Sequence, residues 1–121
     1  MTTMKRIMLK AKIHHARVTE TNVNYEGSLS LPADLMDAAG MLPFEKVHVY
    51  NVSNGERFST YLLKGEAGST TVGVYGAAAH RAHPGHKLII VCYAILDEEE
   101  TEFFLPRILL LDADNRIIES R

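Results

Sequence analysis

The chain has 121 residues, of which 46% are hydrophobic, and its formal net charge is −2 from 13 basic and 15 acidic residues. This length predicts one domain over residues 1–121. The balanced charge argues against nucleic acid as a partner, because domains that bind it carry a basic face. The sequence lacks a secretory signal, and its longest apolar run, 88–96, is about half a membrane span. With Cys92 as the single cysteine, these features predict a cytoplasmic protein without a membrane partner.

The first third of the chain predicts strand and then helix. Residues 7–19 are rich in strand-forming side chains and predict a strand pair or one long bent strand. A helix is expected next, because Ser30 can cap it, Pro32 suits its first turn and Gly40 can end it.

The rest of the chain is dominated by strand signals. Residues 46–50 and 58–63 predict two strands of a hairpin, since Asn54-Gly55 between them is the strongest short turn signal. Residues 76–80 predict a helical turn because alanine is the best helix former. Many short strands with one or two short helices predict a mainly β fold, namely a compact β-barrel. Further strands are expected over 70–75, 88–96 and 107–111.

The segment Tyr25-Glu26-Gly27-Ser28 is the first candidate for chemistry. The Ser28 hydroxyl can attack the Gly27 carbonyl in an N-to-O acyl shift, and glycine there tolerates the strained backbone. Elimination and hydrolysis then leave a pyruvoyl group, a ketone that forms an imine with an amine and withdraws electrons. Taken alone, Gly-Ser is an ordinary turn in most proteins.

A second candidate is the strand that follows the predicted hairpin turn. Alternation puts Arg57, Ser59 and Tyr61 on one face. Arg57 could bind a carboxylate through two parallel hydrogen bonds, and Tyr61 could donate a proton. By the same spacing, Lys12 and His14 share a face and form a candidate cationic pair. The alternative for the first segment is a solvated arginine and a packing tyrosine, and the alternative for Lys12 and His14 is an ordinary exposed strand face.

The region around residue 80 carries two clusters. Residues 76–78 are small, so a ligand could approach their backbone N–H groups, although tight packing explains them equally well. His80, His83 and His86 are spaced by three, but Pro84-Gly85 interrupts them and neither cysteine nor carboxylate lies among them. The prediction is therefore that no metal is bound there.

Taken in order, these segments resemble the bacterial L-aspartate 1-decarboxylases, pyruvoyl enzymes that make β-alanine for pantothenate and coenzyme A. The resemblance covers about residues 7–99, and 25–28 and 57–61 are its most specific blocks. The tail after Glu100 matches poorly. The resemblance implies a double-psi β-barrel, a homotetramer with active sites between subunits, and a precursor that cuts itself.

Cleavage between Gly27 and Ser28 is implied, giving a β chain of residues 1–27 and an α chain of residues 28–121. The implied cofactor is a pyruvoyl group made from Ser28, without metal or pyridoxal phosphate. The resemblance implies that Ser28 is the pyruvoyl precursor and forms the Schiff base, that Tyr61 is the proton donor, and that Thr60 helps the acyl shift and contacts the substrate. It implies that Lys12 and Arg57 bind the L-aspartate carboxylates. The remaining implied roles are lining of the substrate site, by Gly76, Ala77 and Ala78, and support near the cleavage point, by His14 and Tyr25.

One position departs from the family pattern. The family often has Asn directly before the Gly-Ala-Ala stretch, and this chain has the bulkier Tyr75. Several alternatives stay open at this level. The chain could be an uncut β-barrel that serves as a binding or assembly module, or an enzyme for another acidic amino acid. Cleavage could be spontaneous or assisted by a maturation factor.

Overall fold

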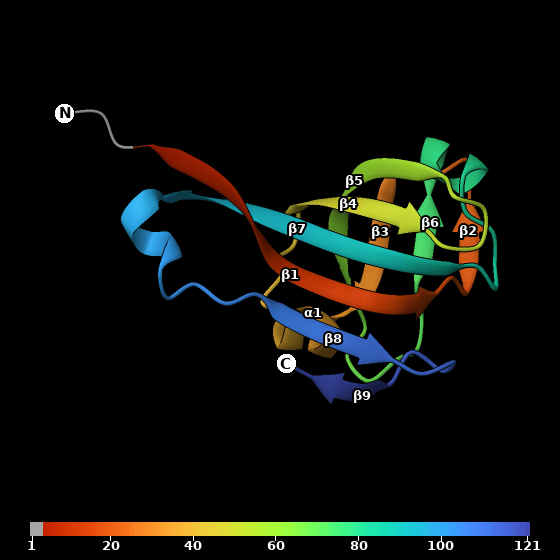
Figure 1. Ribbon diagram of the computed structural model, residues 1–121. Helices are drawn as coiled ribbons and strands as arrows, with labels where there is room; N and C mark the ends of the chain where they lie inside the picture. The colour runs from red at the N-terminus through yellow and green to blue at the C-terminus, as the bar shows by residue number, and fades with distance from the viewer. Residues whose placement is uncertain (1–3) are drawn as a thin grey trace.

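The computed structural model describes residues 4–121 and is mainly β (Figure 1). Within these residues, nine strands form one mixed sheet in the order β2-β6-β3-β5-β4-β7-β1-β8-β9. The strand pairs β1–β8, β2–β6 and β3–β5 are parallel. The predicted double-psi β-barrel class is confirmed. The elements are β1 (Lys5–Arg17), β2 (Glu20–Asn22), β3 (Ser28–Pro32), α1 (Ala33–Ala39), β4 (Lys46–Asn51), β5 (Arg57–Gly65), β6 (Gly73–Tyr75), the 3-10 helix η1 (Gly76–His80), β7 (Lys87–Asp97), the 3-10 helix η2 (Glu98–Thr101), β8 (Arg107–Leu111) and β9 (Ile117–Ser120).

The first strand is one long bent strand, as one of the two predictions for residues 7–19 stated. Its ladder with β7 shifts register between Leu9 and Ala11 and between His14 and Ala16. The second shift falls at His15, whose φ of 68° is the left-handed backbone typical of a bulge. Figure 1 shows β1 and β7 running side by side far beyond the rest of the sheet.

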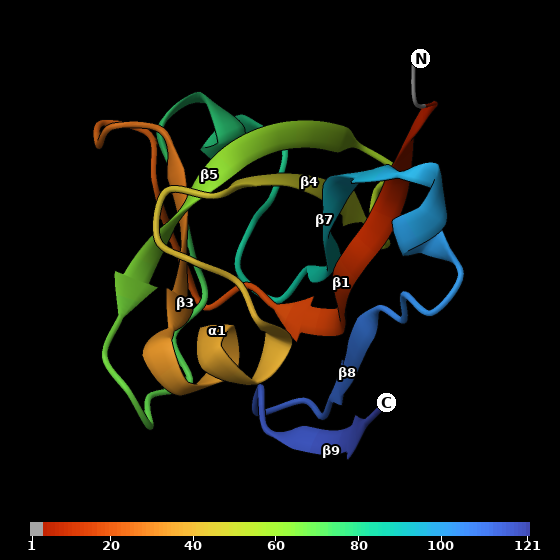
Figure 2. The same ribbon diagram turned by 90° about the vertical axis from the view of Figure 1, so that its left-hand side faces the viewer.

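The predicted helix exists, but its start was predicted wrongly. Ser30 is the third residue of β3 and does not cap α1, whose N-cap is Pro32 without a side-chain hydrogen bond. The predicted end is confirmed, because Gly40 adopts φ 70° and its N–H donates to the Asp37 carbonyl at 3.1 Å. In Figure 2, α1 closes the lower end of the barrel beside β8.

The two faces of the central strands differ in character. One face forms the core, where Ile13, Val47, Leu62 and Ile90 are fully buried. Their strand neighbours point outward by the two-residue period of a strand. This outer face of β3, β5, β4, β7 and β1 carries the polar strand residues named as candidates from the sequence, except Thr60, and it is called the polar face below.

Among residues 4–121, no helix is long enough and apolar enough to span a bilayer.

Cys92 lies in the core, and we expect it to resist alkylation in the folded protein. It is fully buried on β7, and burial, followed by the nearby Glu45 carboxylate, raises the pKa of its thiol to about 11. Because the thiolate is the reactive form, iodoacetamide at pH 8 should leave the native chain unmodified and label it fully in guanidinium. Mass spectrometry measures this difference, and rapid labelling of the native chain would contradict it.

Candidate active site

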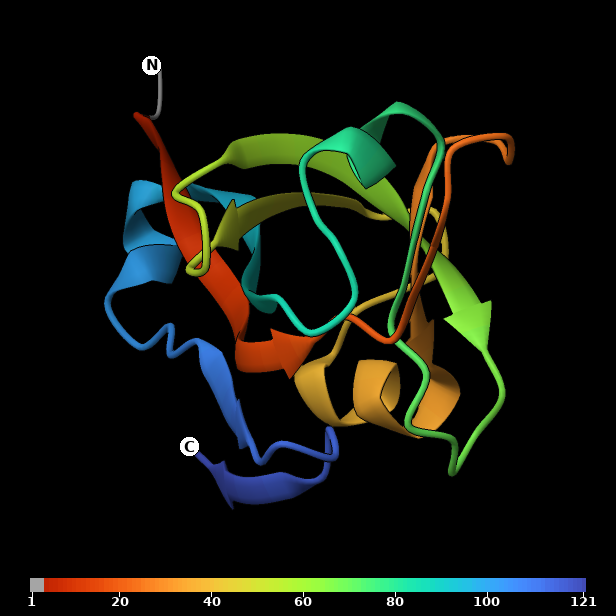
Figure 3. The same ribbon diagram turned by 90° about the vertical axis from the view of Figure 1, so that its right-hand side faces the viewer.

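The Gly27–Ser28 bond lies where a loop enters the sheet. Residues 23–27 form the loop between β2 and β3, which projects beside η1 in Figures 2 and 3. Tyr75 of β6 pairs with Asn22 on one side of this loop and with Ser28 on the other. Both ends of the loop are therefore fixed to the same residue of β6. Ser28 is 0% exposed, and its hydroxyl donates a long hydrogen bond of 3.4 Å to the Glu26 carbonyl.

A second glycine packs against the scissile segment. Gly76 adopts φ 74°, and a Cβ built on it would lie 2.5 Å from the Gly27 Cα and 2.6 Å from the Gly27 nitrogen. A side chain at this position would therefore collide with the bond's own glycine. The predicted helical turn follows as η1, in which Ala78 packs against the core and Ala77 is exposed. Of the three predicted lining residues, Gly76 has the closest approach to the loop.

A cavity of about 310 Å³ opens beside Ser28, lined by Tyr25, Glu26, Ser28, Leu63 and Tyr75. The rings of Tyr25 and Tyr75 meet edge to face with centroids 5.4 Å apart. The Tyr75 hydroxyl donates a 2.8 Å hydrogen bond to a carboxylate oxygen of Glu20. Burial, and then this bond, raise the pKa of Tyr75 to about 12, so its proton stays on the oxygen at neutral pH.

Tyr61 and Thr60 lie on β5, the parallel neighbour of β3. Leu29 pairs with Leu62 in this parallel ladder. Continuing the same register by one residue toward the N-terminus places Ser28 beside Tyr61 on the polar face. Thr60 pairs with the buried Val47 on the core side. Alternation therefore separates the two residues as predicted. Among residues 4–121, no hydrogen bond joins Thr60 to Ser28.

Arg57 lies at the start of β5 and is supported by aromatic residues. Its guanidinium carbon stands 4.4 Å from the Tyr50 ring centroid, a cation–π arrangement, and the Tyr50 hydroxyl is 2.9 Å from that of Tyr93. Arg57 precedes Tyr61 by four residues, roughly 13 Å along a strand. Neither tyrosine is among the candidates predicted from the sequence. Alternation in residues 46–50 could have placed Tyr50 on this face, whereas Tyr93 was hidden within an apolar run.

Lys12 and His14 share a separate pocket of about 150 Å³ on β1, lined further by Ile108, Leu110 and Arg121. The His14 Nδ1 atom is buried without a hydrogen-bond partner among the described residues. Burial, followed by repulsion from the neighbouring His15 and Lys12, lowers the pKa of His14, which favours a neutral ring at pH 7. Lys12 and His14 therefore share a face as the alternation predicted, but a neutral His14 does not make a cationic pair. Their pocket faces β8 rather than Ser28.

The candidate residues thus form three groups on the polar face. The first surrounds the scissile bond and contains Gly27, Ser28, Tyr25, Tyr61 and Gly76. The second is Arg57 with its aromatic support. The third is Lys12 with His14, and strands β5, β4 and β7 separate it from β3.

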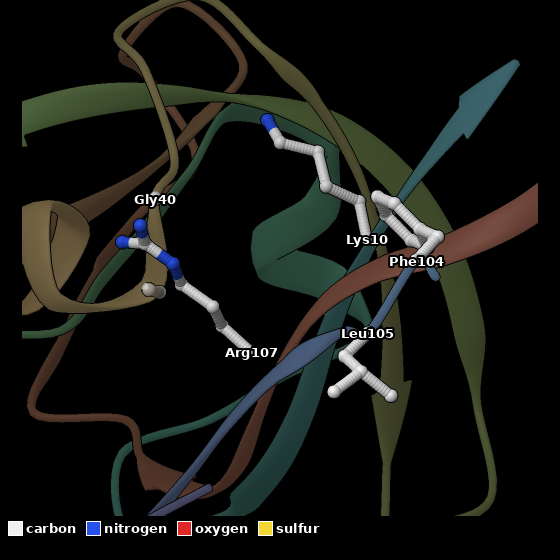
Figure 4. A pocket seen from close by; sticks show the side chains of 6 residues that line it. Lys10, Gly40, Phe104, Leu105 and Arg107 are labelled. Carbon is white, nitrogen blue, oxygen red and sulfur yellow. The ribbon is translucent and has the colours of Figure 1, made fainter. Parts of the chain in front are cut away.

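Another cavity, of about 230 Å³, lies between α1 and β8, and Figure 4 shows Lys10 and Arg107 at its rim. The surroundings of both cations are explained by the fold. Lys10 donates to a Glu45 carboxylate oxygen at 2.7 Å. Arg107 packs on Gly40 at the C-terminal end of α1, where helix carbonyls favour a positive charge. This cavity contains none of the predicted site residues.

The three histidines near residue 80 do not converge. His83 and His86 meet edge to face at 5.3 Å, and the His86 Nδ1 atom lies 3.0 Å from the Asn51 amide nitrogen. No group of three or more potential metal ligands occurs within the part of the chain that the structure describes.

Comparison with known proteins points to one family. The model of the family described as aspartate decarboxylase matches residues 4–118. The aspartate 1-decarboxylase of Ralstonia nicotianae is 53% identical over 116 residues, which cover 96% of this chain and 97% of that protein. Those of Thioalkalivibrio sulfidiphilus and Bordetella avium are 51% and 48% identical, over 93% and 98% of this chain and 90% and 97% of their own lengths.

The match also corrects one prediction. The tail after Glu100 was expected to lie outside the resemblance, whereas the family model extends to residue 118. The tail contains β8, which pairs with β1 beside Lys12 and contributes Ile108 and Leu110 to its pocket. With the family model covering residues 4–118 and relatives at about half identity over nearly the whole chain, this chain belongs to the aspartate decarboxylase family.

Proposed function

We propose that the chain cuts itself between Gly27 and Ser28, converts Ser28 into a pyruvoyl group, and decarboxylates L-aspartate at C1. The products are carbon dioxide and β-alanine, the precursor used in pantothenate synthesis. The observation that carries the proposal is the packing of Gly76 against Gly27 next to a fully buried serine hydroxyl. An ordinary surface turn requires neither feature.

The self-cleavage begins with the Ser28 hydroxyl oxygen adding to the Gly27 carbonyl carbon. The Gly27–Ser28 C–N bond breaks, which leaves an ester on the serine oxygen and a free amine on Ser28. Loss of the Ser28 Cα proton then expels the Gly27 carboxylate and leaves dehydroalanine. Water hydrolyses its imine tautomer to the ketone and releases ammonia. The balance is one water consumed and one ammonia released for each bond cut.

The residues present fit such a group. Ser28 is buried, and the cavity of about 310 Å³ beside it gives a small substrate room to approach. When formed, the pyruvoyl ketone supplies an electron sink for the carbon that loses carbon dioxide. The rings of Tyr25 and Tyr75, which meet edge to face, form one wall of this cavity.

Tyr61 is the proposed proton donor to the substrate α-carbon. It lies beside Ser28 by strand register, whereas the proton of Tyr75 is already donated to Glu20. The exchange balances, because the substrate α-carbon loses the C1 carboxylate as carbon dioxide and gains one proton in its place. Solvent then restores the Tyr61 proton.

Lys12 and Arg57 are the proposed partners of the two substrate carboxylates. Lys12 lies four strand spacings from β3, roughly 19 Å across the sheet. Its pocket faces β8, which increases the separation from Ser28. A substrate as short as aspartate cannot bridge this distance within one chain. We therefore propose that Lys12 and His14 act on Ser28 of a neighbouring copy, in the homotetramer that the family resemblance implies.

An intact mass spectrum of the denatured protein tests the self-cleavage. The expected result is two fragments, residues 1–27 and 28–121, with the larger one lighter by one ammonia than the product of simple hydrolysis. Borohydride reduction should add two hydrogens to that fragment alone. A full-length mass that persists after prolonged warming would contradict spontaneous processing, and a lack of aspartate decarboxylation would contradict the function.

A shared active site predicts complementation between two inactive variants. Ser28→Ala retains Lys12, and Lys12→Ala retains the serine that makes the pyruvoyl group. Randomly mixed assemblies should recover about one quarter of wild-type activity, since half of the chains carry each intact residue. The assay is β-alanine formation by co-expressed chains, with the processing of each chain followed by mass.

The matched control mixes Ser28→Ala with Tyr61→Phe. Both residues belong to the same group in one chain, so this mixture should recover no more than its Tyr61→Phe component provides. Equal recovery in the two mixtures, or none in the first, would argue against a site divided as proposed.

A further inference from the structure

One hydrogen bond near the scissile segment joins parts of the chain that cleavage would separate. Glu20 lies on β2 in residues 1–27, and Tyr75 lies on β6 in residues 28–121. The Tyr75 hydroxyl donates to the Glu20 carboxylate at 2.8 Å. We call this pair the Glu20–Tyr75 latch.

Gly73 makes the latch geometrically feasible. It lies two residues before Tyr75 on the same face of β6 and pairs with Glu20 of β2. A Cβ built on Gly73 would overlap the Tyr75 hydroxyl and ring. The phenol therefore lies flat across a residue without a side chain to reach the carboxylate beyond it. Gly73 does not adopt a positive φ, so its backbone conformation does not require glycine. Glycine is required here because Tyr75 occupies the space that a side chain would fill.

The loop that carries the bond has few other attachments on this side. Its internal hydrogen bonds are local, from the Tyr25 N–H to the Asn22 carbonyl at 3.4 Å and from the Asn24 N–H to the Asn22 side chain at 2.9 Å. These bonds shape the loop but do not tie it to the sheet. Its first end is held by the three-residue pairing of β2 with β6, by hydrogen bonds between Thr19 and Val72 directly before that pairing, and by the latch, which is the side-chain bond nearest the loop.

We infer that the Glu20–Tyr75 latch is a positioning device for self-cleavage, which holds β2 on β6 so that the Gly27 carbonyl stays within reach of the Ser28 hydroxyl. Tyr75 pairs with both Asn22 and Ser28, so fixing its side chain to β2 fixes both ends of the loop relative to each other. The rate of a reaction between two groups falls steeply when one of them is misplaced by about 1 Å. The inference rests on the proposed self-cleavage.

After the cut, the latch becomes a contact between fragments. Residues 5–17 stay bound through the long pairing of β1 with β7. The segment after β1, with the new carboxylate at Gly27, is held near Ser28 by β2 and the latch. Tyr25, whose ring meets that of Tyr75, then remains as a wall of the cavity.

The test measures cleavage rate from the moment of synthesis in a reconstituted cell-free system, by intact mass over time. Tyr75→Phe removes the donor and keeps the ring, Glu20→Ala removes the acceptor, and Glu20→Gln keeps an acceptor oxygen. We expect Tyr75→Phe and Glu20→Ala each to slow cleavage about tenfold, as loss of a hydrogen bond to a charged group suggests. Glu20→Gln should recover most of the rate. The double variant should be no slower than either single one, because both remove the same bond.

Two further variants separate positioning from stability. Gly73→Ala places a methyl group where the Tyr75 ring lies. It should therefore displace the ring and slow cleavage at least as much as Tyr75→Phe does. Glu66→Ala, in the exposed turn after β5, is the matched control and should cleave at the wild-type rate.

The outcomes are distinct. Wild-type cleavage rates in Tyr75→Phe and Glu20→Ala would overturn the inference and leave the proposed function standing. Additive effects in the double variant, or slowing that follows the loss of melting temperature across all variants, would also overturn it. An uncut wild-type chain would instead contradict the proposed function.

Discussion

Replacing Ser28 with alanine is expected to leave every chain uncut and to reduce aspartate decarboxylation to background. Alanine lacks the oxygen that attacks the Gly27 carbonyl, so neither the ester nor the ketone can form. The fold should persist, because Ser28 is buried with only one long hydrogen bond, 3.4 Å to the Glu26 carbonyl. The measurement combines intact mass, carbon dioxide release from aspartate labelled at C1, and circular dichroism.

Ser30 offers a control in the same strand. It is half-buried, two residues further along β3, and therefore on the same face as Ser28. Ser30→Ala should be cut and active like the wild type. Decarboxylation above background by an uncut Ser28→Ala protein would show that the reaction needs no group derived from Ser28, and the proposed function would have to be abandoned.

Local signals in the sequence were sufficient for much of the fold. The hairpin of β4 and β5 follows from Asn54-Gly55, where Gly55 adopts the positive φ of 77° that the turn requires. The end of α1 follows from Gly40 for the same reason. The start of α1 could not be predicted correctly, because Ser30 and Pro32 look like a helix start and in fact end β3. Pairing of β3 with β5 and β6 overrides the local preference.

Long-range pairing could not be read from the sequence. The parallel ladder of β1 with β8 joins residues 96 positions apart, such as Ala11 and Arg107, and β2 is only three residues long. Neither has a local signal, since parallel partners are linked by long crossovers rather than by turns. The tail after Glu100 was undervalued for this reason, although its strand β8 borders the pocket of Lys12.

The sequence predicts which candidate residues share a strand face, but it does not predict how far apart the strands place them. Alternation placed Arg57 and Tyr61 on one face and Thr60 on the other, as the structure has them. It could not reveal that Lys12 lies several strands away from Ser28, because that separation depends on strand order. Strand order is also what makes a site divided between two copies the simplest way to bring Lys12 to the substrate.

Replacing Tyr61 with phenylalanine is expected to spare self-cleavage and to lower turnover by about 10²–10⁴-fold, the range for loss of a positioned proton donor. Cleavage should persist because none of its proposed bond changes uses the Tyr61 hydroxyl. Since the donor acts only in the transition state, kcat and kcat/KM should fall together while aspartate binding is kept. The ring stays to pack near Phe44, whose centroid lies 6.4 Å away, so stability should change little.

A structural role for Tyr61 would lower activity too, and the product made in deuterated water distinguishes the two roles. Protonation by a side chain fixed on one side of the substrate should give β-alanine with one deuterium in a single configuration at the aminomethyl carbon. The residual reaction of Tyr61→Phe should take its deuteron from unoriented water and give a mixture of configurations. A product of unchanged configuration made at a normal rate would remove Tyr61 from its proposed role. A slow reaction with unchanged configuration would mean that another fixed group on the same side delivers the proton, and Tyr25, an exposed phenol that lines the cavity, would be the next residue to test.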